Sequence, residues 1–251
     1  TSTSSHHIHP FNQLIGSIAL CNDGSLLVAA QQGPAIFNPQ DKTFVQYPFF
    51  ETGAINNRFN DGKCDADGRF WVGTMSMNET AGAGSLYTMN AYFQFKDQLK
   101  NLTIPNGMAW SNDGNCFYFI DTLSYCVMAY NYDAATARLS NGRAVIKISP
   151  SEGAPDGMTI DEEGMLWIAH WDGWQVTRWD PGTGKQLFSL KLPVARVTSC
   201  VFGGKDLSDL YITTAFDRLT KEELSAQPLA GSLFVWKNCG FKGRNPDRFK
   251  R

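Results

Sequence analysis

One pattern of apolar and polar positions recurs along the chain. It consists of a polar step that includes Gly or Asn, a short apolar run, a tight turn ending in Gly, and a second apolar run. The turn glycines are Gly24, Gly68, Gly114 and Gly164, at intervals of 44, 46 and 50 residues. Short apolar runs separated by Gly-containing turns are typical of antiparallel strands. The pattern therefore predicts a series of β-hairpins.

The repeats also define an architecture, because each hairpin is followed by a further β-rich stretch such as residues 175–192. Four strands per repeat and a period of about 45 residues are typical of a β-propeller blade. A β-sandwich is the alternative for many short strands, and the repeat period favours the propeller. The clear copies are residues 15–30, 59–74, 105–121 and 155–170, and residues 197–215, with Asp209 at the turn, form a looser fifth copy.

Helices contribute little to this pattern. Residues 219–227 have a helical composition, but the segment is too short for more than a loop helix. We interpret residues 1–13 as a disordered segment or an N-terminal remnant, and residues 14–251 as one propeller domain. The first part of the chain has no secretory signal, and a cytoplasmic protein is expected.

Composition narrows the class of partner. Apolar residues make up 43% of the 251 residues, charged residues 18%, and the formal net charge is −2. Neither nucleic acid nor an anionic membrane is expected as a partner, because no basic run provides the charge that both require. Apolar runs are strand-sized, too short to span a bilayer. We expect a small-molecule ligand, while the oligomeric state stays open.

Cysteines do not indicate a metal or redox site. The six are far apart and lie mostly in apolar segments, without paired-cysteine spacing. We therefore expect buried free thiols.

Comparison of the repeats with one another singles out one position. Eight residues before the turn glycines stand Gly16, Asn60, Asn106 and Asp156. Equivalent positions on successive blades converge on the axis of a propeller. An oxygen-only set of two carboxamides and one carboxylate suits a hard divalent cation such as Ca²⁺ or Mg²⁺. The alternative is that these residues only cap turns, as Asn and Asp often do.

Four motifs carry a family resemblance that extends from about residue 14 to residue 243. In family order and spacing, they are RFNDGKCDADGRFWVGTM (58–75), IPNGMAWSNDGNCFYFIDTLSY (104–125), PDGMTIDEEGMLWIA (155–169) and VTSCVFGGKDLSDLYIT (197–213). With them the chain resembles the SMP-30/gluconolactonase/luciferin-regenerating-enzyme family. The resemblance implies a six-bladed β-propeller with one divalent cation on its axis and hydrolysis of sugar lactones.

The resemblance also implies roles for individual residues. Asn106 in PNGMAW and Asp156 in PDGMTI correspond to metal ligands. Arg58 and Asn60 in RFNDGK correspond to residues that face the substrate, and Asn60 also lies near the metal. Glu79, shortly after the GTM motif at 73–75, corresponds to an acid that contacts the substrate.

One family motif has no counterpart here. The E-G-P-x-W motif of the first blade, whose glutamate is a metal ligand in the family, is missing, and five blades are evident instead of six. A fragment, a natural truncation and closure of the ring by another chain are three explanations. We favour the fragment, because an unclosed propeller exposes sheet edges.

The function that follows is metal-dependent hydrolysis of a sugar lactone, with Asp156 as general base and Ca²⁺ as the first choice among Ca²⁺, Zn²⁺, Mn²⁺ and Mg²⁺. Arg58, Asn60 and Glu79 are expected to bind sugar hydroxyls. His170 and Trp171 are candidates for the mouth of the site or for plain packing. Two alternatives stay open: a non-catalytic Ca²⁺-binding or protein-binding propeller, and a related metal-dependent esterase or phosphotriesterase.

Overall fold

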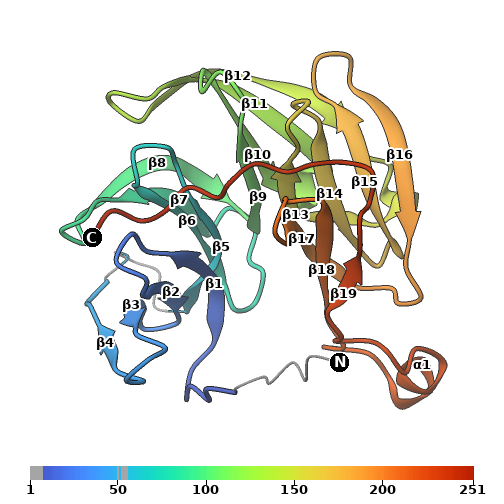
Figure 1. Ribbon diagram of the computed structural model, residues 1–251, viewed down its shortest axis with the longest axis horizontal. Coiled ribbons are helices and arrows are strands. Elements are labelled where there is room, and N and C mark those ends of the chain that lie inside the picture. Colours follow the sequence, from blue (N-terminus) through green and yellow to red (C-terminus); the bar gives the residue numbers. More distant parts are fainter. Residues whose placement is uncertain (1–7, 50, 52–55) are drawn as a thin grey trace.

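A computed structural model describes residues 8–49, 51 and 56–251 (Figure 1). All the strands of the described residues belong to five antiparallel sheets that follow one another along the chain. The first sheet contains β1 (Ile15–Leu20), β2 (Leu26–Ala30), β3 (Gly33–Phe37) and β4 (Phe44–Gln46). The second contains β5 (Asn57–Cys64), β6 (Phe70–Ser76), β7 (Gly84–Met89) and β8 (Phe95–Leu102).

The remaining sheets repeat this arrangement. The third contains β9 (Pro105–Trp110), β10 (Cys116–Asp121), β11 (Cys126–Asp133) and β12 (Arg138–Lys147). The fourth contains β13 (Ala154–Ile160), β14 (Leu166–Trp171), β15 (Gln175–Asp180) and β16 (Lys185–Lys191). The fifth contains β17 (Val197–Gly203), β18 (Asp209–Thr214) and β19 (Phe234–Trp236).

The five sheets are blades of a propeller, which confirms the predicted fold class and the count of five blades. Strand order within each sheet follows the chain, and the first strand of each blade packs against the first strand of the next, from β1 through β5, β9 and β13 to β17. Figure 1 shows the resulting arc, with the first and fifth sheets at its two ends.

The two ends of the arc differ from its middle. In the described part of the chain, β17 and β1 do not pack together as the other neighbouring inner strands do. Every residue of β9 is buried, whereas Ile18 of β1 is 59% exposed and Val201 of β17 is 51% exposed. Apolar side chains that a closed ring would cover are therefore open to solvent.

Helical structure is limited, as the sequence predicts. The α-helix α1 (Lys221–Ala226) begins at Thr220, which forms a capping box with Glu223. Short 3₁₀ turns occupy η1 (Thr122–Ser124) and η2 (Pro150–Glu152). Among the described residues no helix is long and apolar enough to cross a membrane.

The N-terminal segment that the sequence assigns to a remnant is described from residue 8 onward, and residues 1–7 lie outside the described residues. In the described part, the Phe11 ring packs edge-on against Phe37, with ring centroids 5.4 Å apart, and also contacts Phe44. These residues thus cover one face of the first blade.

Free thiols are found at all six cysteines. Cys21, Cys64, Cys200 and Cys239 are buried, as expected, while Cys116 and Cys126 are half-buried. Burial in apolar surroundings raises the pKa of the Cys64 thiol, which makes it a poor nucleophile.

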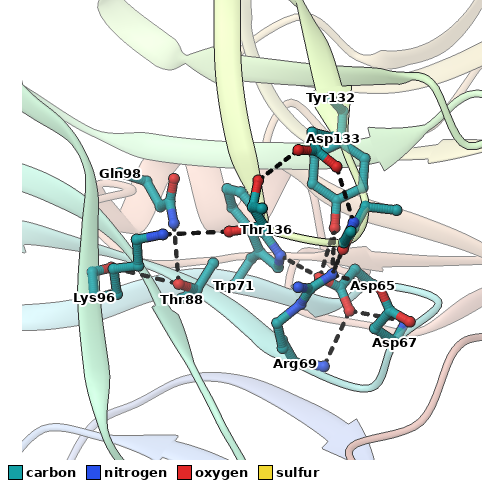
Figure 2. A network of polar contacts seen from close by, with 12 residues as sticks. Asp65, Asp67, Arg69, Trp71, Thr88, Lys96, Gln98, Tyr132, Asp133 and Thr136 are labelled. Carbon is teal, nitrogen blue, oxygen red and sulfur yellow. Dashed lines mark hydrogen bonds and ion pairs between the residues drawn. The ribbon is translucent and has the colours of Figure 1, made fainter.

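A buried polar network joins the second and third blades (Figure 2). Asp65, at the β5–β6 turn, is fully buried and accepts hydrogen bonds from Arg69 Nε at 2.7 Å and Trp71 Nε1 at 2.8 Å. The Tyr132 hydroxyl of β11 donates to the same carboxylate at 2.8 Å. The fourth blade repeats the turn with Asp161, which accepts from Trp167 Nε1 at 2.9 Å.

The C-terminal strap, residues 242–251, crosses the ends of four blades (Figure 1). It first contacts the hairpin turns of the fourth and third blades, with a bridge between Gly243 and Asp161 and a hydrogen bond from Arg244 Nη1 to Asn112 Oδ1 at 3.0 Å. Further on, Lys250 N donates to Gly68 O, and Phe249 bridges to the first blade. The strap thus ties the sheets together at the end where each inner strand finishes.

Candidate metal and substrate site

The candidate ligands owe their position to a break in regular pairing. Each inner strand shifts register near its start, where residues lie between two paired positions; in β5 this interval is Phe59 to Gly62, and in β13 it is Pro155 to Met158. The strands β1, β9 and β17 have the same irregularity. A β-bulge redirects side chains and is common next to active sites.

The bulges bring the repeat-equivalent residues to the axis. Asn60, Asn106 and Asp156 lie at these bulges, and all three line one cavity of about 410 Å³. Arg58 and Glu79 line the same cavity, so the structure brings together every site residue that the sequence predicts. Their chemical roles stay predictions.

Glycine allows the inner strands to approach. A Cβ at Gly107 would lie 2.5 Å from the Cβ of Met158 and 2.8 Å from the backbone oxygen of Asp156. Both distances are too short for a side chain, so the Asn-Gly pair of β9 lets this strand lie directly against β13. Asn106 and Asp156 are neighbours for this reason.

Arg58 and Asn60 form one end of the cavity. The Arg58 Nη1 donates to the backbone oxygen of Phe59 and to Asn60 Oδ1, both at 2.9 Å. Asn60 Nδ2 donates to Pro105 O at 2.9 Å, which fixes the orientation of the amide. Burial lowers the pKa of Arg58, while the charges of Glu79 and Asp156 oppose this shift.

Asp156 and Asn106 form the floor. Asn106 is 6% exposed, and its Nδ2 donates to Thr122 Oγ1 at 3.0 Å, so that Oδ1 is free of this bond. Burial raises the pKa of Asp156 well above its usual range, and the charge of Asp61 adds to the rise. The Asn106 amide lowers it in part. A cation beside Asp156 would therefore stabilise the charged form of this carboxylate.

Two charged residues of the RFNDGK motif were not singled out by the sequence. Asp61 and Lys63 follow Asn60 on β5, and Lys63 Nζ donates to Met158 O at 2.7 Å. Burial raises the pKa of Asp61 and lowers that of Lys63. The available signal was that Asp61 and Lys63 occupy alternate positions of an inner strand.

Loops from distant blades form the mouth. Glu79, in the β6–β7 turn, and Arg218, between β18 and α1, both line the cavity, and their side chains form an ion pair of 2.7 Å. Trp171, for which the sequence leaves the mouth and plain packing open, also lines the cavity, together with Asp172. Sequence comparison did not reveal Arg218, because its loop lies outside the repeated hairpins.

His170 does not belong to this lining. Its side chain is fully buried, with Nε2 2.6 Å from Thr177 Oγ1 and Nδ1 3.0 Å from the backbone oxygen of Glu152. Burial lowers its pKa to about 4, so the ring is neutral at physiological pH. Packing is therefore its role.

The donor set fits a hard divalent cation. Asp156 supplies one negative charge, Asn106 Oδ1 is not used by its Thr122 bond, and Asn60 Oδ1 keeps a second lone pair beside its bond to Arg58. Among the described residues no group of three or more His, Cys, Asp or Glu is arranged to hold a metal ion. Oxygen donors of this kind suit Ca²⁺ or Mg²⁺, whose remaining positions water or substrate can fill.

Comparison with known proteins finds a matching protein family and several similar proteins. Residues 1–216 match the family described as the SMP-30/Gluconolactonase/LRE-like region. Regucalcin from Oryctolagus cuniculus is 43% identical over 238 residues, which cover 92% of this chain and 79% of the relative.

Two solved structures are similar in fold as well. A crystal structure of a calcium-binding protein, regucalcin from Agrobacterium tumefaciens, has a TM-score of 0.89 and 28% identity, covering 97% of this chain and 81% of that one. A luciferin-regenerating enzyme has a TM-score of 0.88 and 32% identity, covering 96% of this chain and 83% of that one.

Proposed function

Because the chain belongs to the SMP-30/gluconolactonase/LRE-like family, we propose that it hydrolyses a sugar lactone with one bound divalent cation. The observation that carries the proposal is the single cavity of about 410 Å³ lined by Arg58, Asn60, Glu79, Asn106 and Asp156. This volume accommodates a monosaccharide lactone, and both a cation site and hydrogen-bonding groups border it.

In this proposal Asp156, Asn106 and Asn60 hold the cation, with Ca²⁺ the first choice. The regucalcin from Agrobacterium tumefaciens is a calcium-binding protein, which supports that choice, while Mg²⁺, Mn²⁺ and Zn²⁺ are the alternatives. When bound, such a cation supplies Lewis acidity toward a carbonyl oxygen.

The protein groups bind and orient the substrate. The partly buried Arg58 guanidinium donates to ring hydroxyls, and Glu79 accepts from them at the mouth. Buried polar groups give specificity, since a substrate that lacks the matching hydroxyl leaves them unpaired. Asp156 takes the proton from the attacking water, because it is a carboxylate that lines the cavity together with the proposed cation ligands Asn60 and Asn106.

A panel of substrates tests this function. The parent protein should hydrolyse gluconolactone faster than acyl-lactones or phosphotriesters, lose activity with a chelator, and regain it with Ca²⁺ or another divalent cation. Hydrolysis of phosphotriesters or simple esters in preference to lactones would contradict the proposal, as would turnover that a chelator leaves unchanged.

Asp156→Ala should lower kcat for gluconolactone by at least about 100-fold, because it removes both the base and the charged metal ligand. Asp172→Asn is the matched control, since Asp172 lines the same cavity but pairs with Arg196 at 2.9 Å. Steady-state kinetics at saturating metal measure both. Parent-like kcat in the Asp156 variant would show that another group is the base.

One observation favours a second candidate function, calcium binding without catalysis. The proposed donor set contains a single carboxylate, that of Asp156, beside two carboxamides. Fewer anionic ligands weaken cation binding. A protein that binds Ca²⁺ without turning over any lactone in the panel would be a calcium-binding propeller.

A further inference from the structure

The ion pair between Glu79 and Arg218 links loops of two blades that are not neighbours. Glu79 belongs to the second blade and Arg218 to the fifth, with the third and fourth blades between them. Both side chains line the cavity whose floor holds Asn106 and Asp156. The 2.7 Å contact between Arg218 Nη1 and Glu79 Oε1 therefore crosses the mouth from one side to the other.

The pair is on the solvent side of the site. The Arg218 side chain is 61% exposed and that of Glu79 is 34% exposed, whereas Asn106 below them is buried. Glu79 and Arg218 both have left-handed backbone conformations, with φ of 54° and 59°. Such conformations are uncommon for residues with a side chain, and strained residues of this kind cluster at functional sites.

A second guanidinium, that of Arg58, lines the same cavity as Glu79 and Arg218. Burial lowers the pKa of Arg58, and the charge of Glu79 opposes this shift while that of Arg218 adds to it. Arg218 also contacts Asp217 Oδ2 through Nε at 3.3 Å, and its pKa is raised mainly by Glu79. In the described contacts Arg218 uses only Oε1 of Glu79, which leaves Oε2 as an acceptor for a substrate hydroxyl.

We propose that Arg218 is a positioning residue that holds Glu79 over the mouth and restricts the cavity to compact polyhydroxy lactones. This inference rests on the proposed lactonase function. A fixed Glu79 binds a ring hydroxyl at lower entropic cost than a mobile one. The bridge also obstructs lactones with a long alkyl chain, which would have to extend through the mouth.

The test compares three variants in steady-state kinetics. Arg218→Ala should raise KM for gluconolactone about fivefold with little change in kcat, as expected from the loss of an exposed ion pair. Arg218→Lys keeps the charge and should restore most of the parent KM. Lys221→Ala is the control, because Lys221 is an exposed cation nearby on α1 without an ion pair among the described residues.

Two further readouts separate positioning from a general loss of structure. The ratio of kcat/KM for a dodecanolactone to that for gluconolactone should rise in Arg218→Ala. High salt should raise KM of the parent but not of this variant, because salt screens an exposed pair. Unchanged KM and unchanged selectivity in Arg218→Ala, or equal shifts in Lys221→Ala, would overturn the inference.

Calorimetric binding of gluconate keeps this test independent of turnover. If the parent does not hydrolyse lactones, the proposed function fails, and gluconate affinity then tests Arg218 alone. About fivefold weaker binding in Arg218→Ala supports the positioning role. Equal affinity of parent and variant overturns it, and a parent that binds no gluconate overturns both proposals.

Discussion

A single carboxylate, Asp156, carries the negative charge that the metal site offers, and its neighbours determine how it behaves. Its raised pKa results first from burial, then from Asp61, and the Asn106 amide offsets only part. The same burial that makes the free carboxylate unfavourable makes a cation beside it favourable. Comparison of the repeats identifies Asp156, because a carboxylate stands here where the equivalent position of the first blade has Gly16.

His170 shows how the surroundings of a residue decide between two interpretations. The sequence leaves it open whether this histidine lines the mouth, and its burial against Thr177 and the Glu152 backbone settles the question in favour of packing. Sequence cannot distinguish these cases, because adjacent residues of β14 point to opposite faces of the sheet.

The burial of His170 predicts a pH dependence of stability. Its pKa is lowered from 6.5 to about 4, so the unfolded chain takes up a proton as the pH falls through 6.5 while the folded chain does not. The free energy of unfolding should therefore lose about 3 kcal/mol through this residue between pH 6.5 and pH 4, and none above that window.

Urea unfolding of the parent and of His170→Gln at several pH values measures this contribution. The variant loses the bond to Thr177 and should be less stable at neutral pH, but its stability should fall less steeply below pH 6.5. Equal slopes in parent and variant between pH 6.5 and pH 4 would contradict the assignment.

At the scale of elements, the hairpin between the first two strands of each blade is the repeated unit, and it was predictable. Gly24, Gly68, Gly114 and Gly164 all have positive φ, as their turn positions require. The fifth copy differs, because Asp209 begins β18 and the positive φ values occur at Gly204 and Leu207. A longer loop there hides the turn from a comparison based on spacing.

The Asp65 network is the element-scale feature with the largest expected effect on stability. Asp65→Ala leaves Trp71 Nε1, the Tyr132 hydroxyl and Arg69 Nε without their shared acceptor. Loss of one partner of a buried ion pair costs about 3–5 kcal/mol of unfolding free energy. Chemical denaturation at pH 7 measures the change.

Asp133→Ala provides the control in the same region (Figure 2). Asp133 is exposed and accepts from the Thr136 hydroxyl at 2.7 Å within its own turn. Its loss should cost about 1 kcal/mol or less. If both variants lost the same stability, the Asp65 network would not join the blades as described.

At the scale of the whole molecule, five blades form an arc whose ends β1 and β17 expose apolar side chains. The sequence predicts the number of blades from the period. It does not predict the C-terminal strap, since residues 242–251 have no periodic pattern and their contacts lie up to 229 residues away in the chain. The pairing of Glu79 with Arg218 escapes prediction for the same reason.

Truncation of a buried side chain in the C-terminal strap should lower the stability of the fold, far from the site. Phe249 is fully buried and packs in the core of the first two blades with Cys21, Cys64 and Phe70. Phe249→Ala should lower the free energy of unfolding by about 3–5 kcal/mol. Phe216→Ala, where the ring is 62% exposed, should change it by about 0.5 kcal/mol or less. Comparable losses in urea unfolding would show that the strap does not stabilise the arc.

The most direct test asks whether the bulged strands bring together ligands for one ion. It is calorimetric titration with Ca²⁺, repeated with Mg²⁺, Mn²⁺ and Zn²⁺. The parent should bind one ion per chain at the cavity floor, Asp156→Ala should bind it at least about 100-fold more weakly, and Asp172→Asn should bind within about twofold of the parent. Equal affinity of the parent and the Asp156 variant would show that no ion is held where Asn60, Asn106 and Asp156 meet.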